Sequence, residues 1–585
     1  MFRIEYIEKY LEKNRNIQAK LLDFLDNEDN FQVLNQLFEE TKLRDNQHEL
    51  RLFLNFLLKI ANNYHLNPDF FTKIEEILRY FKDDIKQYTN HEIIDIFVSS
   101  KRILLFLIEE EVITVDEYFV KTITKEKYAK KKYPLFFLPE VKPFMNERWF
   151  PKYDPNEYRL RFNIWTKELM KELPENFYEL RKKGENESFL CQLIREDLLV
   201  DFISHTSRTN ISVNTKIKPS IYETNSFLIQ KENESENGIT LIEYAAFFGS
   251  IQIFNYLRMR EVKLTSSLWL FVIHGRNSEL IHLLEENLIE PILPISKHSK
   301  KVEKSYEKCF FESIKCHHND VANYFLNNYL QIEDENSNET LIQSLKYYNF
   351  FFIKKENINE SSFCHLCHYD YFLLVDYLLK SVDVDVNQYY KDNYESRTAL
   401  FMAIEKGNIE IIKLLLMNDK LDINLTIKIN LEEDKNTIIE MAPLQFAIEN
   451  NRHDEVIQLL LSQEYLNSSQ KIDVNKRSII AIIGDEIEVI EKTSLFMSIE
   501  KKKIDAIKAL LNMADIDVNE KSLYSLNDVL INEKAALHLA VENDDLDIVK
   551  LLLEKKEIDI NIEDSQGKKP IDYSNNDEIS QLLSK

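Results

Sequence analysis

Apolar residues recur along the C-terminal part of the chain at the spacing of short amphipathic helices that come in pairs. Between Ala535 and Asn561, the runs AALHLAVE and DDLDIVKLLLEK each place their apolar residues on one helical face. The polar residues Asn543-Asp544-Asp545 separate the runs and predict a turn. Neither helix is long enough to be stable alone in water, so each must bury its apolar face on a neighbour.

The same helix pair recurs upstream with a constant internal spacing. A leucine of the first helix is followed 24 residues later by a closing asparagine in three places: Leu400 with Asn424, Leu495 with Asn519 and Leu537 with Asn561. Phe363 and Asn387 show the same spacing. A spacing that is kept while the residues between it vary indicates a structural repeat.

These motifs resemble the ankyrin repeat, whose consensus joins TPLHLAA, a turn, an EVVKLLL-like helix and a closing DVN with a period of about 33 residues. TALFMAIEKGNIEIIKLLL, from Thr398, and AALHLA with IVKLLL and DIN match it closely. Nine such motifs follow between residues 240 and 561, and a shorter polar one at 565–583 fits a terminal capping repeat. The resemblance implies a mainly α fold over residues 221–585, an α-solenoid with β-hairpin fingers.

Residues 1–220 also read as helical but lack the TPLH-like motif. Degenerate repeats and another all-α array both remain open for this region. Residues 131–160 hold five prolines and many aromatic residues, which predict an irregular connector packed by its own rings. The expected helices are a long first helix with one face marked by Ile4, Leu11, Leu21 and Leu25, then Phe31–Thr41, Glu49–Asn62, Pro68–Phe81, His91–Val98, Lys101–Glu111, Asp116–Ile123, Asn163–Leu173, Glu175–Lys183 and two within Ser188–His205.

Several motifs resemble a large ankyrin-repeat family of trichomonad-type protists. They are LLDFLDNEDNF (21–31), KRILLFLIEEEVITVDE (101–117), KPSIYETNSFL (218–228) and SLWLFVIHGRNSELIHLLEEN (267–287). The resemblance covers nearly the whole chain. It implies no biochemical activity for the N-terminal helical region, and so it adds no catalytic residue.

The connections between consecutive repeats are longer than the ankyrin period requires. From a closing asparagine to the next first-helix leucine, about nine residues are expected, whereas Asn424 to Leu444 spans 20 and Asn519 to Leu537 spans 18. Two of these insertions, 425–441 and 476–492, alternate like strand pairs around polar turns and predict extended hairpin fingers. A tolerated surface loop and a widened recognition face are both consistent with this pattern.

One acidic position recurs in the first helices, and we predict it to contact a partner. Glu405, Glu449, Glu500 and Glu542 each follow directly after AI, AI, SI or AV. In the ankyrin geometry this position faces the concave surface. Four carboxylates in one column repel one another unless cations meet them, so a solvated helix face and a docking stripe for a basic peptide remain alternatives.

Charge and composition narrow the classes of partner. The 585 residues carry 74 basic and 99 acidic side chains, a formal charge of −25. Such a chain repels phosphates and anionic lipids, so we expect neither nucleic acid nor membrane as a partner, and a basic protein surface is favoured. No apolar run reaches the length of a membrane span, and five cysteines do not suggest a disulfide framework. A cytoplasmic location is the expectation.

Candidate chemistry is sparse. Cys364-His365-Leu366-Cys367-His368 spells a haem-attachment motif, but the repeat register places Cys367 in a core position. Cys309, Cys316, His317 and His318 could be drawn as zinc ligands, yet they lack a second close cysteine pair. We find no phosphate-binding loop and no nucleophile or metalloprotease motif, and we therefore predict no catalytic residue, metal or cofactor.

The sequence favours a non-enzymatic scaffold or adaptor that binds partner proteins through the concave face and fingers of its repeats. The alternative assigns an enzymatic or ligase-recruiting activity to residues 1–220, with the repeats as substrate receptor. A pocket lined by titratable groups with perturbed pKa values in the N-terminal half would favour that alternative. The sequence leaves the oligomeric state open.

Overall fold

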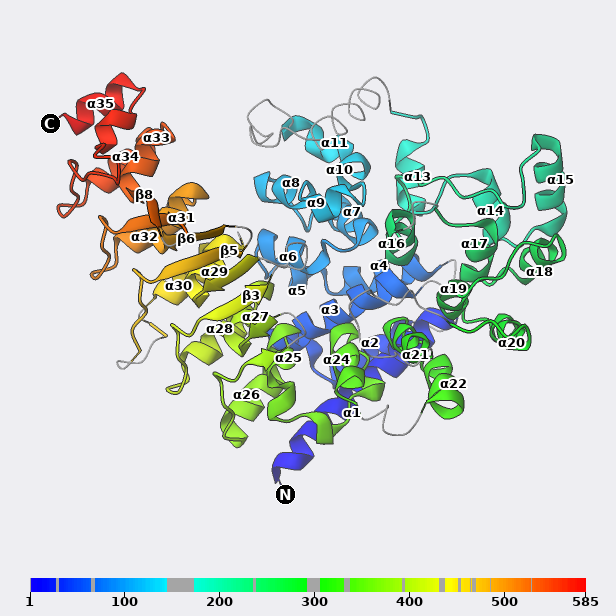
Figure 1. Cartoon of the computed structure of the whole chain (residues 1–585). Coiled ribbons are helices and arrows are strands. Elements are labelled where there is room, and N and C mark those ends of the chain that lie inside the picture. Colours follow the sequence, from blue (N-terminus) through cyan, green and yellow to red (C-terminus); the bar gives the residue numbers. More distant parts are fainter. Residues whose placement is uncertain are drawn as a thin grey trace. The chain divides into compact units, whose positions relative to one another are not determined.

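The chain forms two compact units, Met1–Lys355 and Glu356–Lys585, which are described separately (Figure 1). The sequence-based boundary between residues 220 and 221 lies inside the first unit. The computed structural model describes all residues except 1, 28–30, 65–68, 145–172, 235–237, 292–305, 331–336, 392–394, 431–436, 451–453, 463, 466–469, 484–485, 528 and 585.

The described part of the first unit is all helical. Its α-helices are α1 (Phe2–Asp26), α2 (Phe31–Glu40), α3 (Gln47–Asn63), α4 (Phe70–Tyr80), α5 (Lys82–Ile85), α6 (Asn90–Phe97), α7 (Lys101–Glu109), α8 (Glu117–Ile123), α9 (Glu126–Ala129), α10 (Tyr133–Phe136), α11 (Leu138–Val141), α13 (Phe177–Lys183), α14 (Phe189–Arg195), α15 (Leu199–Thr209), α16 (Ser226–Glu234), α17 (Leu241–Phe247), α18 (Ile251–Met259), α19 (Leu268–Gly275), α20 (Ser278–Glu286), α21 (Glu307–Lys315), α22 (Asn319–Tyr329) and α24 (Asn338–Tyr347). The 3-10 helices are η1 (Leu43–Asp45), η2 (Lys142–Phe144) and η3 (Phe350–Phe352), and η4 (Lys355–Asn357) crosses the boundary between the units.

The helices predicted between residues 2 and 123 are confirmed, because both their periodicity and their start signals are local. The Asn46 side chain accepts hydrogen bonds from the amides of His48 and Glu49 at the start of α3, and Thr89 forms a capping box with Glu92 at α6. The expected irregular connector is wrong over its first part, where α10 and α11 form with prolines in their first turns. Its remainder and most of the predicted helix at Asn163–Leu173 lie outside the described residues.

The helix pairs of the first unit stack as repeats. The stack begins at a helix pair that precedes the first repeat motif of the sequence. The pair α14–α15 packs on α17–α18, and the first helices α17, α19, α21 and α24 pack on one another in turn. The fourth predicted repeat, residues 340–353, departs from the pattern. It has a first helix, α24, but only the 3-10 turn η3 where a second helix was expected, so the regular stack ends just before the boundary of the unit.

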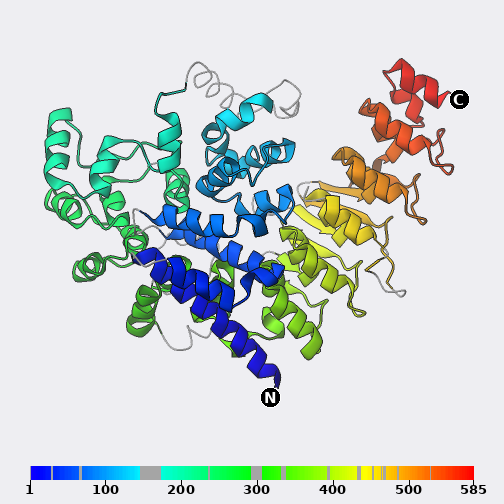
Figure 2. The same cartoon turned by 180° about the vertical axis from the view of Figure 1, so that it is seen from behind.

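The N-terminal helices cover the turns of these repeats (Figures 1 and 2, blue against green). The Gln18 side chain of α1 donates to Asn349 Oδ1 over 2.9 Å and lies 3.1 Å from His317 Nδ1. Arg15 donates to the carbonyl oxygens of Phe350 and Ile353. Polar side chains of α1 therefore hold the N-terminal region against the turns of the first repeats.

Contacts with α1 also reach two turns of this unit that lack the usual glycine. Arg276 and His317 have φ values of 47° and 57°, a left-handed conformation that costs most residues about 1 kcal/mol or more. Arg276 Nη1 bonds Asp26 of α1 over 3.0 Å, and His317 bonds Gln18. Contacts with the N-terminal helices thus offset the backbone cost at these turns.

The second unit consists of helix pairs with fingers between them. Its helices are η5 (Glu360–Ser362), α25 (Phe363–His368), α26 (Phe372–Ser381), α27 (Ala399–Lys406), α28 (Ile409–Leu416), α29 (Pro443–Glu449), α30 (Asp454–Leu461), α31 (Ser494–Glu500), α32 (Ile504–Leu511), α33 (Ala536–Glu542), α34 (Leu546–Leu553), η6 (Pro570–Tyr573) and α35 (Asp577–Leu583). The first helices α25, α27, α29, α31 and α33 stack in one layer, and the second helices α26 to α34 stack in another. The predicted ankyrin-repeat solenoid is confirmed, and η6 and α35 lie where the sequence predicts a short capping repeat.

The predicted register is confirmed by equivalent environments in successive repeats. Leu400, Leu495 and Leu537 are all buried. Four of the five closing asparagines bond the backbone of the next repeat with both amide atoms. Asn424 Nδ2, for example, donates to Lys471 O over 2.8 Å, and its Oδ1 accepts from Asp473 N over 2.8 Å. Asn387, Asn475 and Asn519 make the same pair of bonds. The recurrence of asparagine therefore reflects a repeated inter-repeat clamp.

The fingers join into one antiparallel sheet of eight strands in sequence order. Its strands are β1 (Tyr390–Lys391), β2 (Glu395–Arg397), β3 (Ile427–Asn430), β4 (Thr437–Met441), β5 (Arg477–Ile483), β6 (Ile487–Thr493), β7 (Lys521–Leu526) and β8 (Val529–Ala535). The two predicted hairpins, β3–β4 and β5–β6, are confirmed. The hairpin β7–β8 was missed, although Asn527-Asp528 between two apolar runs is a turn signal. Pairing between neighbouring fingers was also not predicted.

Candidate partner-binding surface

One face of the finger sheet carries a continuous apolar row. Side chains alternate between the two faces of a sheet, so residues directly opposite one another on neighbouring strands share a face. The pairing runs without interruption from β3 to β7. The row consists of Ile429, Ile439, Ile480, Ile490 and Tyr524, all partly exposed.

This apolar face points toward the first helices of the repeats. Three basic residues lie on the same face of the sheet as the apolar row. Each of them lies two positions along its strand from a residue that either belongs to the row or pairs with a residue of the row. Each bonds a glutamate of a first helix: Arg397 with Glu405, Lys492 with Glu500 and Lys534 with Glu542. The inner side of the fingers and the concave side of the helices therefore form one surface.

All four predicted glutamates lie on this surface, and each forms an ion pair with a basic side chain. The nitrogen-to-oxygen distances are 2.6 Å for Arg397–Glu405, 2.8 Å for Lys492–Glu500 and 2.7 Å for Lys534–Glu542. In each pair the cation stands eight residues before the glutamate. Met441 occupies that place before Glu449, which instead pairs with Lys501 of the next repeat over 2.8 Å.

These ion pairs change the net charge that we expect along the column of four glutamates. The glutamates do not form an unbalanced acidic stripe, because each carboxylate has a cation beside it. The sequence analysis missed the cations Arg397, Lys492 and Lys534, although their constant spacing of eight residues to the glutamate is visible in the sequence. Since the pairs are partly exposed, each contributes no more than about 1 kcal/mol to stability. We call the apolar row together with Glu405, Glu449, Glu500 and Glu542 the inner finger surface.

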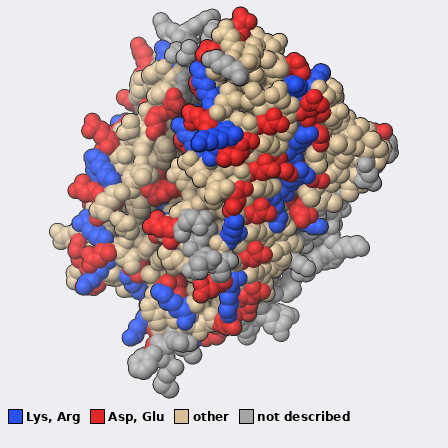
Figure 3. Space-filling model, turned by 90° about the vertical axis from the view of Figure 1, so that its left-hand side faces the viewer, with Lys and Arg blue, Asp and Glu red and all other residues tan. Residues whose placement is uncertain are grey.

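Charges of both signs also mix elsewhere on the molecule. Figure 3 shows basic and acidic side chains side by side over much of the face it views.

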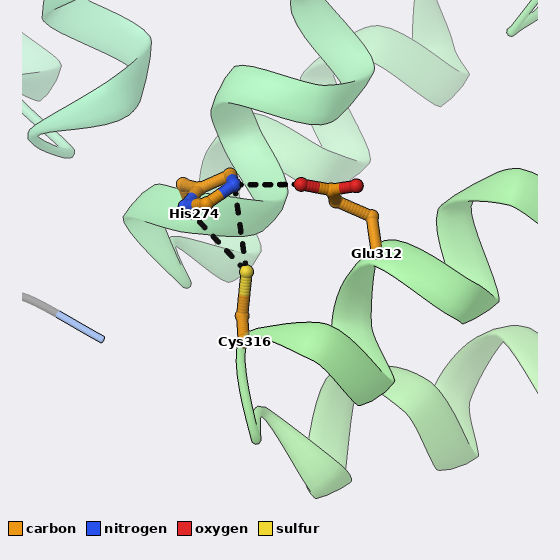
Figure 4. A group of neighbouring side chains, drawn as sticks. All are labelled: His274, Glu312 and Cys316. Carbon is orange, nitrogen blue, oxygen red and sulfur yellow. Dashed lines mark hydrogen bonds and ion pairs between the residues drawn. The ribbon is translucent and has the colours of Figure 1, made fainter. Parts of the chain in front are cut away.

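A second group of polar side chains lies buried in the first unit. His274 lies in the last turn of α19. Glu312 lies in the last turn of α21, and Cys316 follows directly after that helix (Figure 4). His274 Nε2 lies 2.8 Å from Glu312 Oε1, and Cys316 Sγ lies 3.5 Å from both ring nitrogens of His274. The imidazole also packs against Phe227, with ring centroids 4.1 Å apart.

This cluster has the donor types of a metal site, but its charges are already balanced. Lys315 Nζ bonds Glu312 Oε1 over 2.7 Å, and this is the oxygen that faces His274. Burial raises the pKa of Cys316 well above its usual value and lowers the pKa of His274, so the thiol stays protonated and the ring neutral. A divalent cation here would face the Lys315 ammonium at close range. The residues fit a hydrogen-bonded core cluster better than a metal centre.

The cluster also does not fit a catalytic triad. Cys316 and His274 both have no exposed surface. A nucleophile and its base must be reachable by substrate, and this pair is sealed within the core. The described residues thus give no support to an enzymatic activity at this cluster.

The zinc constellation considered from the sequence is not assembled in the described chain. Cys316 faces His274, whereas His317 Nδ1 faces Gln18 and His318 Nδ1 lies 2.8 Å from Ile273 O. The true neighbours of Cys316 were missed because His274 lies in a different repeat. The only local signal was the helical spacing of Glu312 and Cys316.

Buried His317 predicts a pH dependence of stability in the first unit. Burial lowers the pKa of this imidazole from 6.5 to about 3, because desolvation penalises its charged form. The unfolded chain therefore binds the proton more readily, and stability is lost as pH falls below 6.5. Between pH 7 and pH 5 we expect a loss of about 2 kcal/mol, measured by urea unfolding.

Replacing His317 with asparagine controls for this assignment. The variant should lose less stability than the native chain over the same pH interval. Equal pH dependence of the two proteins would show that His317 is not the titrating group.

No helix in the described ranges is both long and apolar enough to cross a lipid bilayer.

Comparison with known proteins identifies the repeats. Residues 335–428, 364–478 and 495–585 match the family described as ankyrin repeats (3 copies). None of the curated proteins compared with the chain matches it in sequence. The chain therefore contains ankyrin repeats. The matched residues begin within the end of the first unit, at residue 335. The match supports a protein–protein interaction domain.

Three solved structures align with less than half of the chain. One chain of a complex between a predatory endopeptidase from Bdellovibrio bacteriovorus and an immunity protein has 20% identity and a TM-score of 0.24, and the match covers 38% of this chain and 96% of that one. The human ASB11 ankyrin repeat domain has 14% identity and a TM-score of 0.26, with 47% and 96% covered. The ankyrin repeat domain of Bcl-3, of the IkappaB protein family, has 14% identity and a TM-score of 0.25, with 38% and 97% covered.

Proposed function

We propose that this chain is a non-enzymatic scaffold or adaptor that binds a partner protein through the inner finger surface. The observation that carries the proposal is the uninterrupted apolar row from Ile429 to Tyr524 beside the four glutamates. Stacked repeats present an extended, rigid surface, and lengthened fingers enlarge it. We also propose that residues 221–585 act as the repeat-bearing part, that the chain is cytoplasmic, and that it belongs to the protist ankyrin-repeat family it resembles.

The chemistry of the surface indicates what it would recognise. β-Branched and aromatic side chains in a row favour an apolar strip on the partner. The paired charges beside the row favour a partner that carries polar groups of both signs along the edge of that strip. The net charge of the chain steers basic proteins toward it. A basic protein with an exposed apolar strip therefore fits the surface.

A matched pair of variants tests the proposal. Ile480→Lys/Ile490→Lys places two charges on the inner face of one finger, whereas Ile479→Lys/Val489→Lys places two charges on its outer face. We expect the inner-face variant to reduce recovery of repeat-dependent partners at least tenfold in quantitative affinity capture from the native cell extract. The outer-face variant should retain them.

Equal recovery by both variants would contradict the proposal. Loss of partners from both variants would also contradict it, provided that circular dichroism shows both to be folded.

A further inference from the structure

A cavity of about 310 Å³ lies within the first unit, where the N-terminal helices meet the first repeats. It is lined by residues from the ends of α3, α13, α14 and α17, by α4 and α7, and by the loop residues 184–185 and 223–225. Its volume is that of about ten molecules of liquid water and lies at the small end of ligand pockets. It could hold a compact organic molecule.

The walls of the cavity are rich in aromatic rings. Tyr64 and Phe70 lie against each other with ring centroids 5.8 Å apart, and Phe247 and Phe248 lie 4.9 Å apart. Phe71 completes the aromatic lining. Aromatic walls of this kind favour a flat apolar group, which stacks on or packs edge-on against the rings.

Two cations beside these walls form no ion pair with a described carboxylate, although Glu75 and Glu185 lie near enough to attract the Arg102 charge. The Arg102 guanidinium lies 4.0 Å above the ring of Phe71, and its Nη1 donates to the carbonyl oxygen of Lys183 over 2.8 Å. Among the described residues no carboxylate lies within ion-pair distance of Arg102 or Lys183. Burial lowers the pKa of Arg102 to about 10, which records the cost of holding this charge away from water.

The acidic residues around the cavity are already engaged. Glu185 pairs with Arg195 Nε over 3.1 Å, and Glu196 accepts from the Gln192 side chain over 2.9 Å. Glu223 accepts from the amide of Asn225 over 2.8 Å. A carboxylate brought by a ligand would therefore find Arg102 and Lys183 as its partners, and guanidinium matches carboxylate geometry well.

We propose that this cavity binds a small molecule that joins an aromatic ring to a carboxylate. The ring packs against Phe71 and Phe247, and the carboxylate pairs with Arg102 and Lys183. A simple aromatic acid and an aromatic amino acid share this chemistry.

Calorimetric titration of the full-length chain tests the ligand class. The probes are 3-phenylpropionate, L-phenylalanine and L-phenylalaninamide, which lacks the carboxylate. We expect at least one of the two acids to bind and the amide to bind at least tenfold more weakly. Tighter binding of 3-phenylpropionate would identify a simple acid, and tighter binding of L-phenylalanine would identify an amino acid. Absence of binding by both acids, or equal binding by the amide, would overturn the proposal.

Variants test the two cations. Arg102→Met should weaken binding of the better acid at least tenfold, whereas Arg44→Met should leave it unchanged. Arg44 is a matched control, because its guanidinium lies 3.9 Å above the ring of Tyr80 in the same unit but does not line the cavity. Lys183→Gln changes an exposed side chain and should weaken binding at least threefold even if Arg102→Met fails to fold. Unchanged binding by a folded Arg102→Met protein or by Lys183→Gln would overturn the proposal.

Discussion

Leu552→Asp is expected to unfold the C-terminal repeats of the second unit. Leu552 lies in α34 with none of its surface exposed, and α34 packs on α32 and α35. The substitution removes a buried leucine, which costs about 2 to 5 kcal/mol, and also places a carboxylate in the core. Because each short helix pair depends on its neighbours, the loss should spread to the capping repeat.

Urea unfolding followed by circular dichroism, together with limited proteolysis, measures this effect. Lys556→Asp is the control, because it adds the same carboxylate to an exposed position of the same repeat. The control should keep its native transition midpoint, whereas Leu552→Asp should lose helical signal and become cleavable near residues 536–583. Native helicity and an unchanged midpoint for Leu552→Asp would contradict the placement of this residue in the inter-repeat core.

Glu312→Gln is expected to lower the free energy of unfolding of the first unit by about 3 to 5 kcal/mol. The substitution preserves the shape of the side chain and an acceptor for His274, but it leaves the Lys315 ammonium without its carboxylate. The side chains of Glu312 and Lys315 are only 12% and 15% exposed. Water therefore cannot fully replace the lost partner. Urea unfolding at pH 7 measures the loss.

A second substitution shows whether the charge pair is the cause. Glu312→Gln/Lys315→Met removes both charges, so it should recover at least half of the stability that Glu312→Gln loses. If the double variant is as unstable as the single one, the loss comes from the His274 and Cys316 contacts instead. A single variant as stable as the native chain would contradict the burial of the pair.

The local parts of the fold were predictable from sequence. Helices such as α3 and α6 are predicted by the periodicity of their apolar residues and by capping residues that lie within a few positions of the helix start. The register of the repeats was predictable as well, because Leu400 and Asn424 recur at a fixed spacing. Their physical role, the inter-repeat asparagine clamp, then followed from the structure.

The parts that were not predictable depend on distant residues. The fingers join into a single sheet through pairs such as Ile439 with Ile480, which are separated by a complete repeat. The contact of Gln18 with His317 spans most of the first unit, and no local pattern marks it. The cluster of His274 with Glu312 likewise joins two repeats, so only the three-dimensional stack brings these residues together.

The predicted surface glutamates illustrate an intermediate case. Their common position in the first helix was visible in the sequence, but their environment was not. Glu500, for example, is balanced by Lys492 of a finger strand, and that pairing requires the hairpin to fold back over the helix. Whether these glutamates contact a partner remains a prediction.

Hydrogen–deuterium exchange of the full-length chain, alone and bound to a captured partner, tests the central claim most directly. The account predicts that the partner slows exchange in the finger strands β3 to β8 and in the first helices beside them. Slowed exchange confined to residues 1–355 or to the second helices α26, α28, α30, α32 and α34 would contradict it.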